Sequence, residues 1–329
     1  ESYWYRSGVN QTMRDALQDV VTHGLAFKPN GGKWLDIGAN DGFLLSRVAP
    51  DFTKIACEPS QPFHAELKEV VDHLIPDFFD ADHDFLRVGE RGACDVITSC
   101  AMFYDLDDPN TFVADIKKSL APGGIWINQL SSTRHMLEAC AFDNICHEHR
   151  CYYDEETIAP LYAKHGLGIV NVEYNDVNGG SMRIYARHEA EVPAPWKPAI
   201  TPVHLIAGFG ERVRKWKDFM RYQIEAAHMV GKTIWAYGAS TKGTVTLQYL
   251  DCGDRIMAVA DRNPKKHNRY MVGSWVPITG EAEMRRATPD LLLVLPWAFR
   301  DELIQRERST RKDGTVMLFP LPNPEFIVG

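Results

Sequence analysis

The stretch that decides the fold is residues 33–42, which reads Lys-Trp-Leu-Asp-Ile-Gly-Ala-Asn-Asp-Gly. Its first half has an apolar strand pattern, and the small-residue turn from Gly38 to Gly42 leads into a helical pattern over 43–48. Gly38 and Gly42 have no Cβ, so the turn can adopt left-handed dihedrals and a ligand can approach the main chain closely. The stretch therefore predicts a strand, a tight turn and a helix that form part of a cofactor site.

Acidic side chains at two strand ends indicate the kind of cofactor. Asp36 lies near the end of the first strand, where it can accept a hydrogen bond from an ammonium group. About twenty residues later, Ile55-Ala56-Cys57-Glu58 predicts a second strand that ends in an acid, the place where doubly wound folds bind two ribose hydroxyls. We therefore predict a class I methyltransferase fold that binds S-adenosylmethionine (AdoMet) through Asp36, Gly38, Asn40, Gly42 and Glu58.

NAD-dependent dehydrogenases are the alternative, because they share a glycine-rich turn and a downstream acid. Residues 38–42 do not form G-x-G-x-x-G, and Asn40 and Asp41 stand where a pyrophosphate needs a bare backbone. This pattern favours AdoMet over NAD, and a purely structural turn is a third interpretation.

Composition limits the class of protein. The 329 residues are enough for two domains with separate cores, and a net charge of −8 argues against nucleic acid as a partner. Seven cysteines without a C-x-x-C pair favour free thiols in a reducing cytoplasm, and no apolar run reaches the ~18 residues of a membrane span. We expect a cytoplasmic enzyme, monomeric or homodimeric, that acts on a small molecule and not at a membrane.

Residues 1–190 are predicted to form the first domain, an α/β unit with a Rossmann-like sheet. Its parallel series consists of strands over 93–99 and 125–130, a helix over 110–120, and a helix stop at Ala121-Pro122-Gly123-Gly124. Strands over 168–174 and 182–188 are predicted to pair antiparallel at the sheet edge, an arrangement common in methyltransferases and rare in dehydrogenases.

Residues 191–230 are predicted to form a proline-rich linker and a long amphipathic helix, followed by a second Rossmann-like α/β domain over 231–329. The strands of this domain are expected over 233–237, 256–260, 291–295 and 316–319. Its turn, residues 238–243, lacks the P-loop spacing because the second glycine follows the lysine. We expect Ser240 and Lys242 to contact a nucleotide or phosphate; a packing turn with a solvated lysine is the alternative.

The densest polar cluster is Asp143-Asn144-Ile145-Cys146-His147-Glu148-His149-Arg150-Cys151-Tyr152-Tyr153, which follows the strand over 125–130. Methyl transfer to carbon or oxygen needs a base, and histidine, with a pKa ordinarily near ~6.5, suits that task best. Glu148 and Tyr152 could orient the imidazole or stabilise an enolate oxygen. Structural histidines are one alternative; zinc is another, but the Cys and His spacing is not that of a zinc knuckle, so we expect no metal.

The chain resembles the sugar C-methyltransferases, AdoMet enzymes that methylate a carbon next to a ketone on a nucleotide-linked deoxysugar in antibiotic or polysaccharide pathways. The resemblance extends over nearly the whole chain, and the His-Glu-His and Gly-Gly-Ser-x-Arg elements are its most specific parts. The matching stretches are 3–8 with 10–13, 35–42, 77–79, 147–149 with 152–153, 179–181 with Arg183, 237–239 and 295–297.

The resemblance implies that His149, helped by Glu148 and with His147 nearby, removes the α-proton of a keto sugar, and that the enolate attacks the methyl sulfonium. It implies that Tyr5 closes over the site and that the second domain helps to hold the substrate while its own cofactor-like pocket stays unused. The further expected cofactor contacts are Phe78, Phe79 and Cys100. The further expected substrate contacts are Tyr3, Tyr5, Arg6, Tyr104, Asn178, Gly180, Ser181 and Arg183.

Three features depart from the family pattern. Family members usually carry a zinc-binding cysteine domain before the tyrosine-rich segment, and we interpret its absence here as a missing N-terminal portion. Cys146 replaces a tyrosine, and Ala101 stands where some members have a histidine. Because both losses remove side chains that could hold the sugar or an enolate, an O-methyltransferase with the same base is the alternative, and a non-catalytic AdoMet or nucleotide sensor is a third hypothesis.

Overall fold

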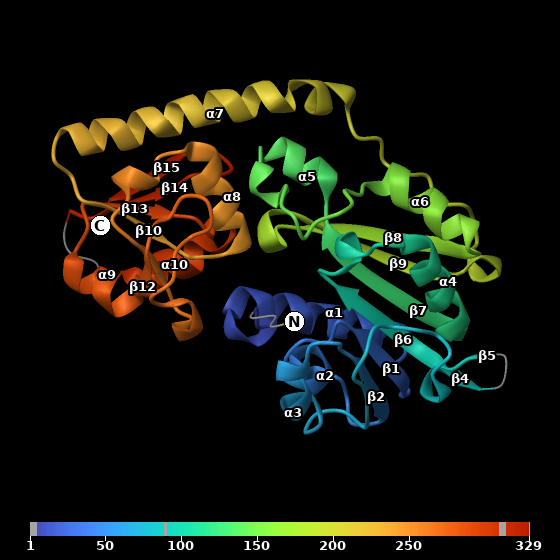
Figure 1. Cartoon of the computed structure of the whole chain (residues 1–329). Coiled ribbons are helices and arrows are strands. Elements are labelled where there is room, and N and C mark those ends of the chain that lie inside the picture. The colour runs from blue at the N-terminus through green and yellow to red at the C-terminus, as the bar shows by residue number, and fades with distance from the viewer. Residues whose placement is uncertain (1–4, 89–90, 309–313, 329) are drawn as a thin grey trace. The chain divides into compact units, whose positions relative to one another are not determined.

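The computed structural model describes residues 5–88, 91–308 and 314–328 (Figure 1). The chain forms two compact units, one of residues 1–133 with 150–201 and the other of residues 134–149 with 202–329. The sequence analysis placed residues 134–149 in the first domain. They pack instead with the second unit, so the His-Glu-His element is part of that unit.

The first unit is built on a seven-stranded sheet in the order β3-β2-β1-β6-β7-β9-β8, the doubly wound arrangement predicted for a class I methyltransferase. β9 is antiparallel to both of its neighbours, which confirms the predicted edge pair. The strands are β1 (Gly32–Ile37), β2 (Phe52–Cys57), β3 (His73–Ile75), β6 (Cys94–Cys100), β7 (Leu120–Ser131), β8 (Leu167–Asn175) and β9 (Ser181–His188), with a short hairpin of β4 (Arg87–Val88) and β5 (Arg91–Gly92) beside them.

Strand β7 begins earlier than predicted. Helix α4 (Pro109–Ser119) ends just before the Ala-Pro-Gly-Gly stretch, which was expected to stop it, and that stretch is already part of β7 because Leu120 pairs with Cys94 of β6. A register shift between Cys94 and Val96 accommodates the extra residues.

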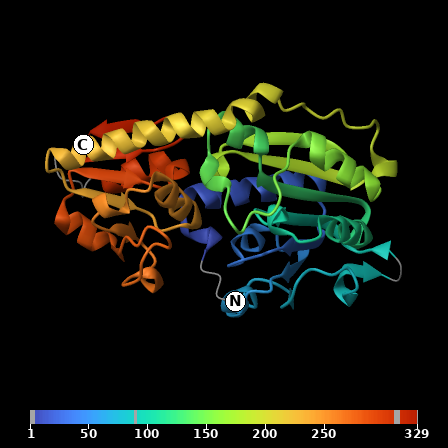
Figure 2. The same ribbon diagram turned by 45° about the horizontal axis from the view of Figure 1, so that its top comes forward.

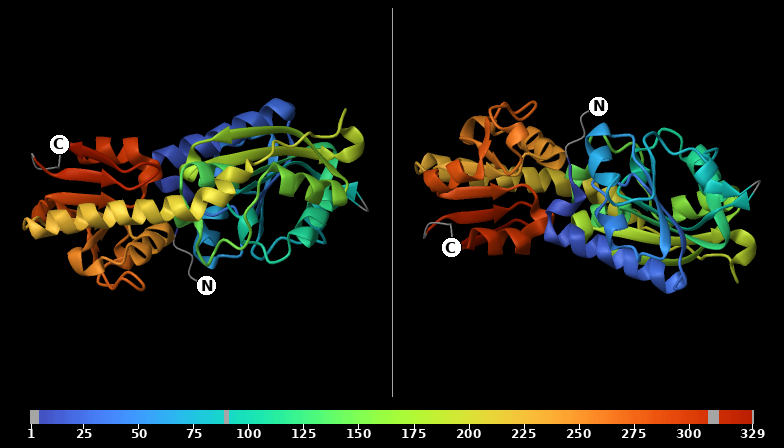
Figure 3. Two further views of the ribbon diagram at one scale, coloured as in Figure 1. Left: turned by 90° about the horizontal axis from the view of Figure 1, so that it is seen from above. Right: turned by 90° about the horizontal axis from the view of Figure 1, so that it is seen from below.

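Helices cover both faces of this sheet (Figure 3). Trp34, Val96 and Ile127 face the first helical layer, whereas their chain neighbours Leu35 and Ile97 face the second, as the two-residue period of a strand requires. The first layer contains α1 (Gln11–Phe27), α2 (Phe43–Arg47) and α3 (His64–Leu67), and the second contains α4 (Pro109–Ser119) and α6 (Glu155–Lys164).

The second unit repeats this plan with a six-stranded sheet in the order β12-β11-β10-β13-β14-β15, in which only β15 is antiparallel to its neighbour. The predicted second Rossmann-like domain is therefore present, and two short strands, β12 and β15, were not predicted. The strands are β10 (Ile234–Tyr237), β11 (Val259–Asp261), β12 (Ile278–Gly280), β13 (Leu291–Val294), β14 (Val316–Phe319) and β15 (Glu325–Val328); the helices are α7 (Val203–Met229), α8 (Thr241–Leu250), α9 (Glu281–Ala287) and α10 (Arg300–Glu307) (Figure 2).

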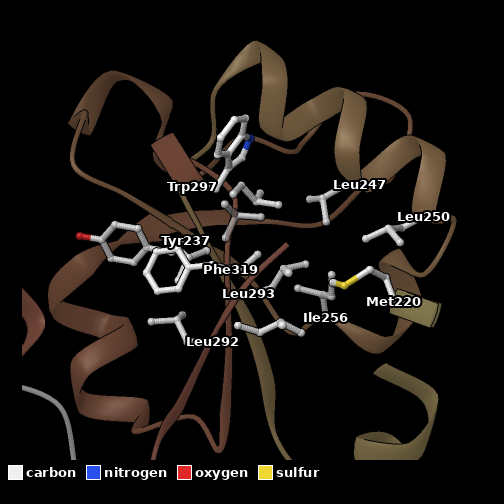
Figure 4. Close-up of a cluster of buried hydrophobic side chains, with 14 of the residues drawn as sticks. Met220, Tyr237, Leu247, Leu250, Ile256, Leu292, Leu293, Trp297 and Phe319 are labelled. Carbon is white, nitrogen blue, oxygen red and sulfur yellow. The ribbon is translucent and has the colours of Figure 1, made fainter. Parts of the chain in front are cut away.

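The core of the second unit lies between this sheet and its helices. Figure 4 shows Leu293 and Phe319 from the strands packed among Met220 of α7, Leu247 of α8 and Trp297. The same cluster contains side chains of α5 (Thr133–Glu138) and of the residues after it, namely Met136, Leu137, Cys140, Ala141 and Phe142. Apolar burial is therefore what attaches residues 134–149 to this unit.

Within the described ranges, no helix is both long and apolar enough to cross a membrane.

Candidate active site

The turn after β1 has the strained geometry that its sequence predicts. Gly38, Asn40 and Gly42 all have left-handed backbones, with φ of 72°, 52° and 76°. The N–H of Gly38 donates to the carbonyl of Cys57 at 2.8 Å, which ties the turn to the end of β2. The turn thus brings main-chain atoms without a Cβ next to both strand ends, as close approach of a ligand requires.

Asp36 is a buried carboxyl at the carboxyl edge of the sheet. Its Oδ1 accepts a hydrogen bond from Thr98 Oγ1 at 2.7 Å, and its side chain is 4% exposed. Burial raises the pKa of Asp36 to about 7, the Thr98 bond opposes this rise, and the charge of Glu58 adds to it. A cationic ligand group beside Asp36 would stabilise its ionised form, which fits the ammonium group of AdoMet.

Glu58 is held in one orientation by two backbone donors. Its Oε2 accepts from the N–H of Asn40 at 2.8 Å and its Oε1 from the N–H of Ser60 at 2.8 Å. Each carboxylate oxygen can accept a second bond, so the side chain can take two ribose hydroxyls without moving. The residues present therefore fit AdoMet: Asp36 would hold the ammonium end, Glu58 the ribose, and the bound cofactor would supply the methyl group.

The polar residues of the turn have a role that the sequence analysis missed. Asn40 Nδ2 donates to the carbonyl of Tyr5 at 3.0 Å, and its Oδ1 accepts from the N–H of Ser7 at 3.0 Å. Asp41 accepts from the N–H of Gly8 at 2.9 Å. Asn40 and Asp41 thus tie the N-terminal segment to the cofactor turn, and their polarity in a turn that needs only small residues was the available signal.

The three residues of the N-terminal segment that were expected to contact the substrate differ in their surroundings. Arg6 Nη1 pairs with Glu66 Oε2 at 2.6 Å and lies over the Phe63 ring, so its guanidinium is engaged within the first unit. Tyr5 is 40% exposed next to the cofactor turn. Tyr3 lies outside the described residues.

The remaining expected cofactor contacts differ in their surroundings. Phe78 is largely exposed, whereas Phe79 packs edge-on against Phe112 of α4 with ring centroids 5.3 Å apart. Cys100 ends β6 near Asp36, and burial together with that charge raises the pKa of its thiol. Tyr104 is buried, and its carbonyl accepts from the N–H groups of Arg150 and Cys151, which fixes the point where the chain re-enters the first unit.

The Gly-Gly-Ser-x-Arg element forms the tight connection between β8 and β9. Asn178 and Gly180 have φ of 54° and 119°, and Ser181 Oγ donates to the carbonyl of Val177 at 2.8 Å. Arg183 is 2% exposed: its Nη1 donates to Asp19 of α1 at 2.7 Å and its Nε to Gln129 of β7 at 2.9 Å. The structure thus places Arg183 in an internal ion pair that joins α1 to the sheet.

The His-Glu-His element belongs to the second unit, whereas Tyr152, 38% exposed, belongs to the first. The side chains of His147 and Glu148 are 84% and 46% exposed, and they form a loose pair with Nε2 and Oε1 4.0 Å apart. Glu148 was expected to assist His149, but the pair that it forms here is with His147.

His149 is half-buried and differs from its neighbour His147 in its electrostatics. The pKa of His149 is lowered to about 4, first by burial and then by the ammonium charge of Lys242, while a hydrogen bond with the Asn144 backbone acts in the opposite direction. Lys242 itself is half-buried beside Asp143, and burial lowers its pKa while Asp143 opposes that change. The structure therefore brings together Lys242 and His149, two candidate residues that are 93 positions apart in the sequence.

The turn that carries Lys242 repeats the geometry of the cofactor turn. Gly238 has φ of 91°, and a Cβ there would lie 2.6 Å from Cδ of Pro296. Asp261, at the end of β11, accepts from the N–H of Ala239 at 2.8 Å, as Glu58 does in the first unit. Ser240 caps α8, since its Oγ accepts from the N–H of Gly243 at 3.1 Å.

Asp261 differs from Glu58 in having a cationic partner, because Lys266 Nζ lies 3.3 Å from its Oδ2. Among the described residues, no group of three or more His, Cys, Asp or Glu side chains is arranged to hold a metal ion.

Comparison with known proteins identifies the class of enzyme. The methyltransferase domain family matches residues 5–172, and the C-methyltransferase C-terminal domain family matches residues 176–322. The chain is 27% identical over 317 residues to C-methyltransferase NovU of Streptomyces niveus, a match that covers 91% of this chain and 74% of NovU.

Solved methyltransferases resemble the chain over about half of its length. An S-adenosylmethionine-dependent methyltransferase from Clostridium acetobutylicum is 15% identical, with 53% of this chain and 91% of that one covered at a TM-score of 0.41. N-methyltransferase NodS of Bradyrhizobium japonicum in complex with S-adenosyl-L-homocysteine is 15% identical, with 55% and 89% covered at a TM-score of 0.41. Because the methyltransferase domain family matches more than half of its residues, the chain belongs to the AdoMet-dependent methyltransferases, and its later residues match the C-terminal domain of the C-methyltransferases.

Proposed function

We propose that this enzyme adds a methyl group to the carbon next to a ketone of a nucleotide-linked sugar, with His149 as the general base. The observation that carries the proposal is the state of His149, a half-buried imidazole whose low pKa keeps it unprotonated at neutral pH. Only the neutral imidazole can accept the α-proton of a ketone, and bound AdoMet would supply the methyl group to the enolate carbon, its methyl–sulfur bond breaking to leave S-adenosylhomocysteine.

A pKa of about 4 makes His149 available but only weakly basic in the free enzyme. Lys242 is part of the cause, so an anionic substrate group beside Lys242 would offset the ammonium charge and raise the pKa of His149. A sugar nucleotide carries such a group in its diphosphate. The base would thus become stronger when the substrate binds.

The turn at residues 238–243 is the proposed place for the nucleotide or phosphate. It precedes the N-terminus of α8, where backbone N–H groups and the helix dipole favour anions. Asp261, which would otherwise repel a phosphate, is paired with Lys266. The same pairing leaves Asp261 less suited than Glu58 to bind a ribose, which supports a substrate site here and argues against a second dinucleotide site.

Solvent hydrogen exchange tests the proposed chemistry. The enzyme is incubated in D₂O, without AdoMet, with a panel of keto-sugar nucleotides, and deuterium at the α-carbon is measured by mass spectrometry. We expect exchange into the accepted substrate and none in a His149→Asn variant, because exchange requires the enolate. A product methylated on oxygen, with no α-carbon exchange, would contradict the proposal.

The His149→Asn variant also gives the first quantitative prediction. Turnover should fall by roughly 10²–10⁴, the usual contribution of a general base, while AdoMet affinity measured by calorimetry stays near that of the wild type. Because kcat/KM reports the free enzyme, it should stay flat from pH 7.5 down to 5.5 and fall only as the pH approaches about 4. His147→Asn is the matched comparison: if it alone abolishes turnover, the base is His147.

A further inference from the structure

The segment that carries the proposed base is attached to the second unit by an aromatic anchor. Phe142 packs against Trp216 of α7 and Tyr249 of α8, with ring centroids 4.6 and 5.0 Å away. Arg212 of α7 donates from Nη2 to the carbonyl of Leu137 at 2.8 Å. These contacts place the short helix η5 (Phe142–Asn144) firmly on the second unit.

A second, polar anchor lies one residue further on. Asp143 is fully buried, and its Oδ2 accepts from Nε1 of Trp297 at 2.8 Å, a bond that spans 154 positions in the sequence. Its Oδ1 has no hydrogen-bond partner within the described part of the chain, while Lys242 attracts its charge. Burial raises the pKa of Asp143, and Lys242, the Trp297 bond and the backbone N–H groups of Asp143 and Asn144 oppose that rise, so the ionised form depends on these partners.

The residue after Asp143 connects the polar anchor to the imidazole of His149. Asn144 follows Asp143 in η5, and its backbone hydrogen-bonds with His149. The N–H of Asn144 donates to the carbonyl of Ala141 at 3.1 Å, so this part of the segment is itself fixed. A shift of Asp143 would therefore also shift the Asn144 backbone, which orients the His149 ring through its hydrogen bond.

We propose that Trp297 and Lys242 are positioning residues for His149, with Trp297 acting through Asp143 and Lys242 facing both Asp143 and the imidazole. This inference rests on the proposed role of His149 as the base. It gives a function to the Leu-Pro-Trp stretch at 295–297, which no step of the reaction itself uses. It also means that the second unit orients the base in addition to its proposed role in substrate binding.

The charged groups around His149 make the effect measurable without a known substrate. The charge that acts on His149 is that of Lys242 on helix α8, and the same ammonium group interacts with Asp143 and Cys146 of the segment. The pKa of His149 can be followed by NMR in protein labelled at histidine. Its signal is assigned by its loss in His149→Asn.

The first test variant is Trp297→Phe, which removes the N–H donor and keeps an aromatic ring. We expect the pKa of His149 to rise from about 4 toward its ordinary value of about 6.5, because a released segment is better solvated. With an accepted substrate, kcat should fall by about 10- to 100-fold, the cost of a misplaced group, while AdoMet affinity is unchanged. Trp235→Phe is the control, since it removes another buried indole of the same unit.

The second test variant is Lys242→Met, which removes the charge and keeps a stem of similar size. It too should raise the pKa of His149, because the lost ammonium group is one of the causes of the low value. The control is Lys232→Met, which removes a lysine paired with Asp290 at the surface of the same unit. This second variant tests the proposal even if Trp297→Phe does not fold.

The positioning role is wrong if folded Trp297→Phe and Lys242→Met both keep the wild-type pKa of His149. A fully active His149→Asn enzyme would instead reject the base assignment, and the NMR comparison would still report whether Trp297 and Lys242 control that imidazole. The two failures are therefore distinguishable.

Discussion

Asp36 shows at the scale of one residue how binding and stability conflict. Its pKa is raised to about 7 in the folded protein, against an ordinary value of 3.8. The folded state therefore binds the proton more tightly than the unfolded state, so ionisation costs stability as the pH rises from about 4 to 7. The cost is retained, in our interpretation, because the ionised carboxyl is the partner of the cofactor's ammonium group.

Asp36→Asn should separate these two effects. The free energy of unfolding at pH 8 should rise by on the order of 1–3 kcal/mol, because the amide carries no charge to desolvate. Denaturant unfolding should also show a flatter pH dependence between pH 4 and 7, whereas AdoMet binding should weaken. Calorimetry of AdoMet binding near pH 7, repeated in buffers of different ionisation enthalpy, should detect a released proton for the wild type and none for Asp36→Asn.

The exposed Asp218→Asn on α7 is the control for the loss of one carboxylate. A folded Asp36→Asn protein with unchanged AdoMet affinity would contradict the assignment of Asp36 to the cofactor.

At the scale of elements, a buried polar network joins α9 and α10 to β10. The hydroxyl of Tyr237 lies 2.6 Å from Oε1 of Glu281 and 3.2 Å from Oε1 of Glu307, so its single proton is available to either carboxylate. Arg285 donates to Glu307 at 2.7 Å, and Arg306 donates to Glu281 at 2.8 Å. Because Glu307 is only 2% exposed, its charge depends on these partners.

Glu307→Ala should lower the free energy of unfolding by about 3–5 kcal/mol, the usual cost of removing one partner from a buried ion pair. Glu283→Ala is the matched control, because that glutamate lies on α9 in an exposed pair with Arg286 and should cost at most about 1 kcal/mol. Chemical denaturation followed by fluorescence measures both. Equal small losses would mean that the network does not hold α9 and α10 to the sheet.

At the scale of the whole molecule, the two sheets share the order of their first five strands but differ in the electrostatics of their turns. Glu58, directly after β2, and Asp261, at the end of β11, each accept from two backbone N–H groups, but only Asp261 is also paired with a cation, that of Lys266. This difference supports the proposal that the first turn binds AdoMet and the second an anionic substrate.

Hydrogen exchange of the backbone amides, measured with each ligand in turn, tests whether the two turns bind different ligands. AdoMet should protect the amides of 38–42 and 58–60 and leave 238–243 unchanged, because its ribose and ammonium partners are in the first unit. Uridine diphosphate should protect 238–243 and leave 38–42 unchanged. Protection of 38–42 by uridine diphosphate, or of 238–243 by AdoMet, would contradict the assignment.

The sequence by itself determined both Rossmann-like units, the cofactor turn and the antiparallel edge pair. These features are local: glycine at left-handed positions, apolar strands and an acid at a strand end can all be read from consecutive residues. Short strands such as β12 and β15 escaped prediction because three or four residues carry too little periodicity, and their pairing partners decide them.

Only the tertiary structure decided where the His-Glu-His segment belongs. The contacts that attach it to the second unit join residues far apart in the chain, as Asp143 does with Trp297 and Phe142 with Trp216. The pKa of His149 is likewise lowered by its burial and by Lys242, neither of which consecutive residues reveal. Burial and charge interactions depend on distance in space, so the sequence could name the candidate base, and the fold alone set its charge state and its neighbours.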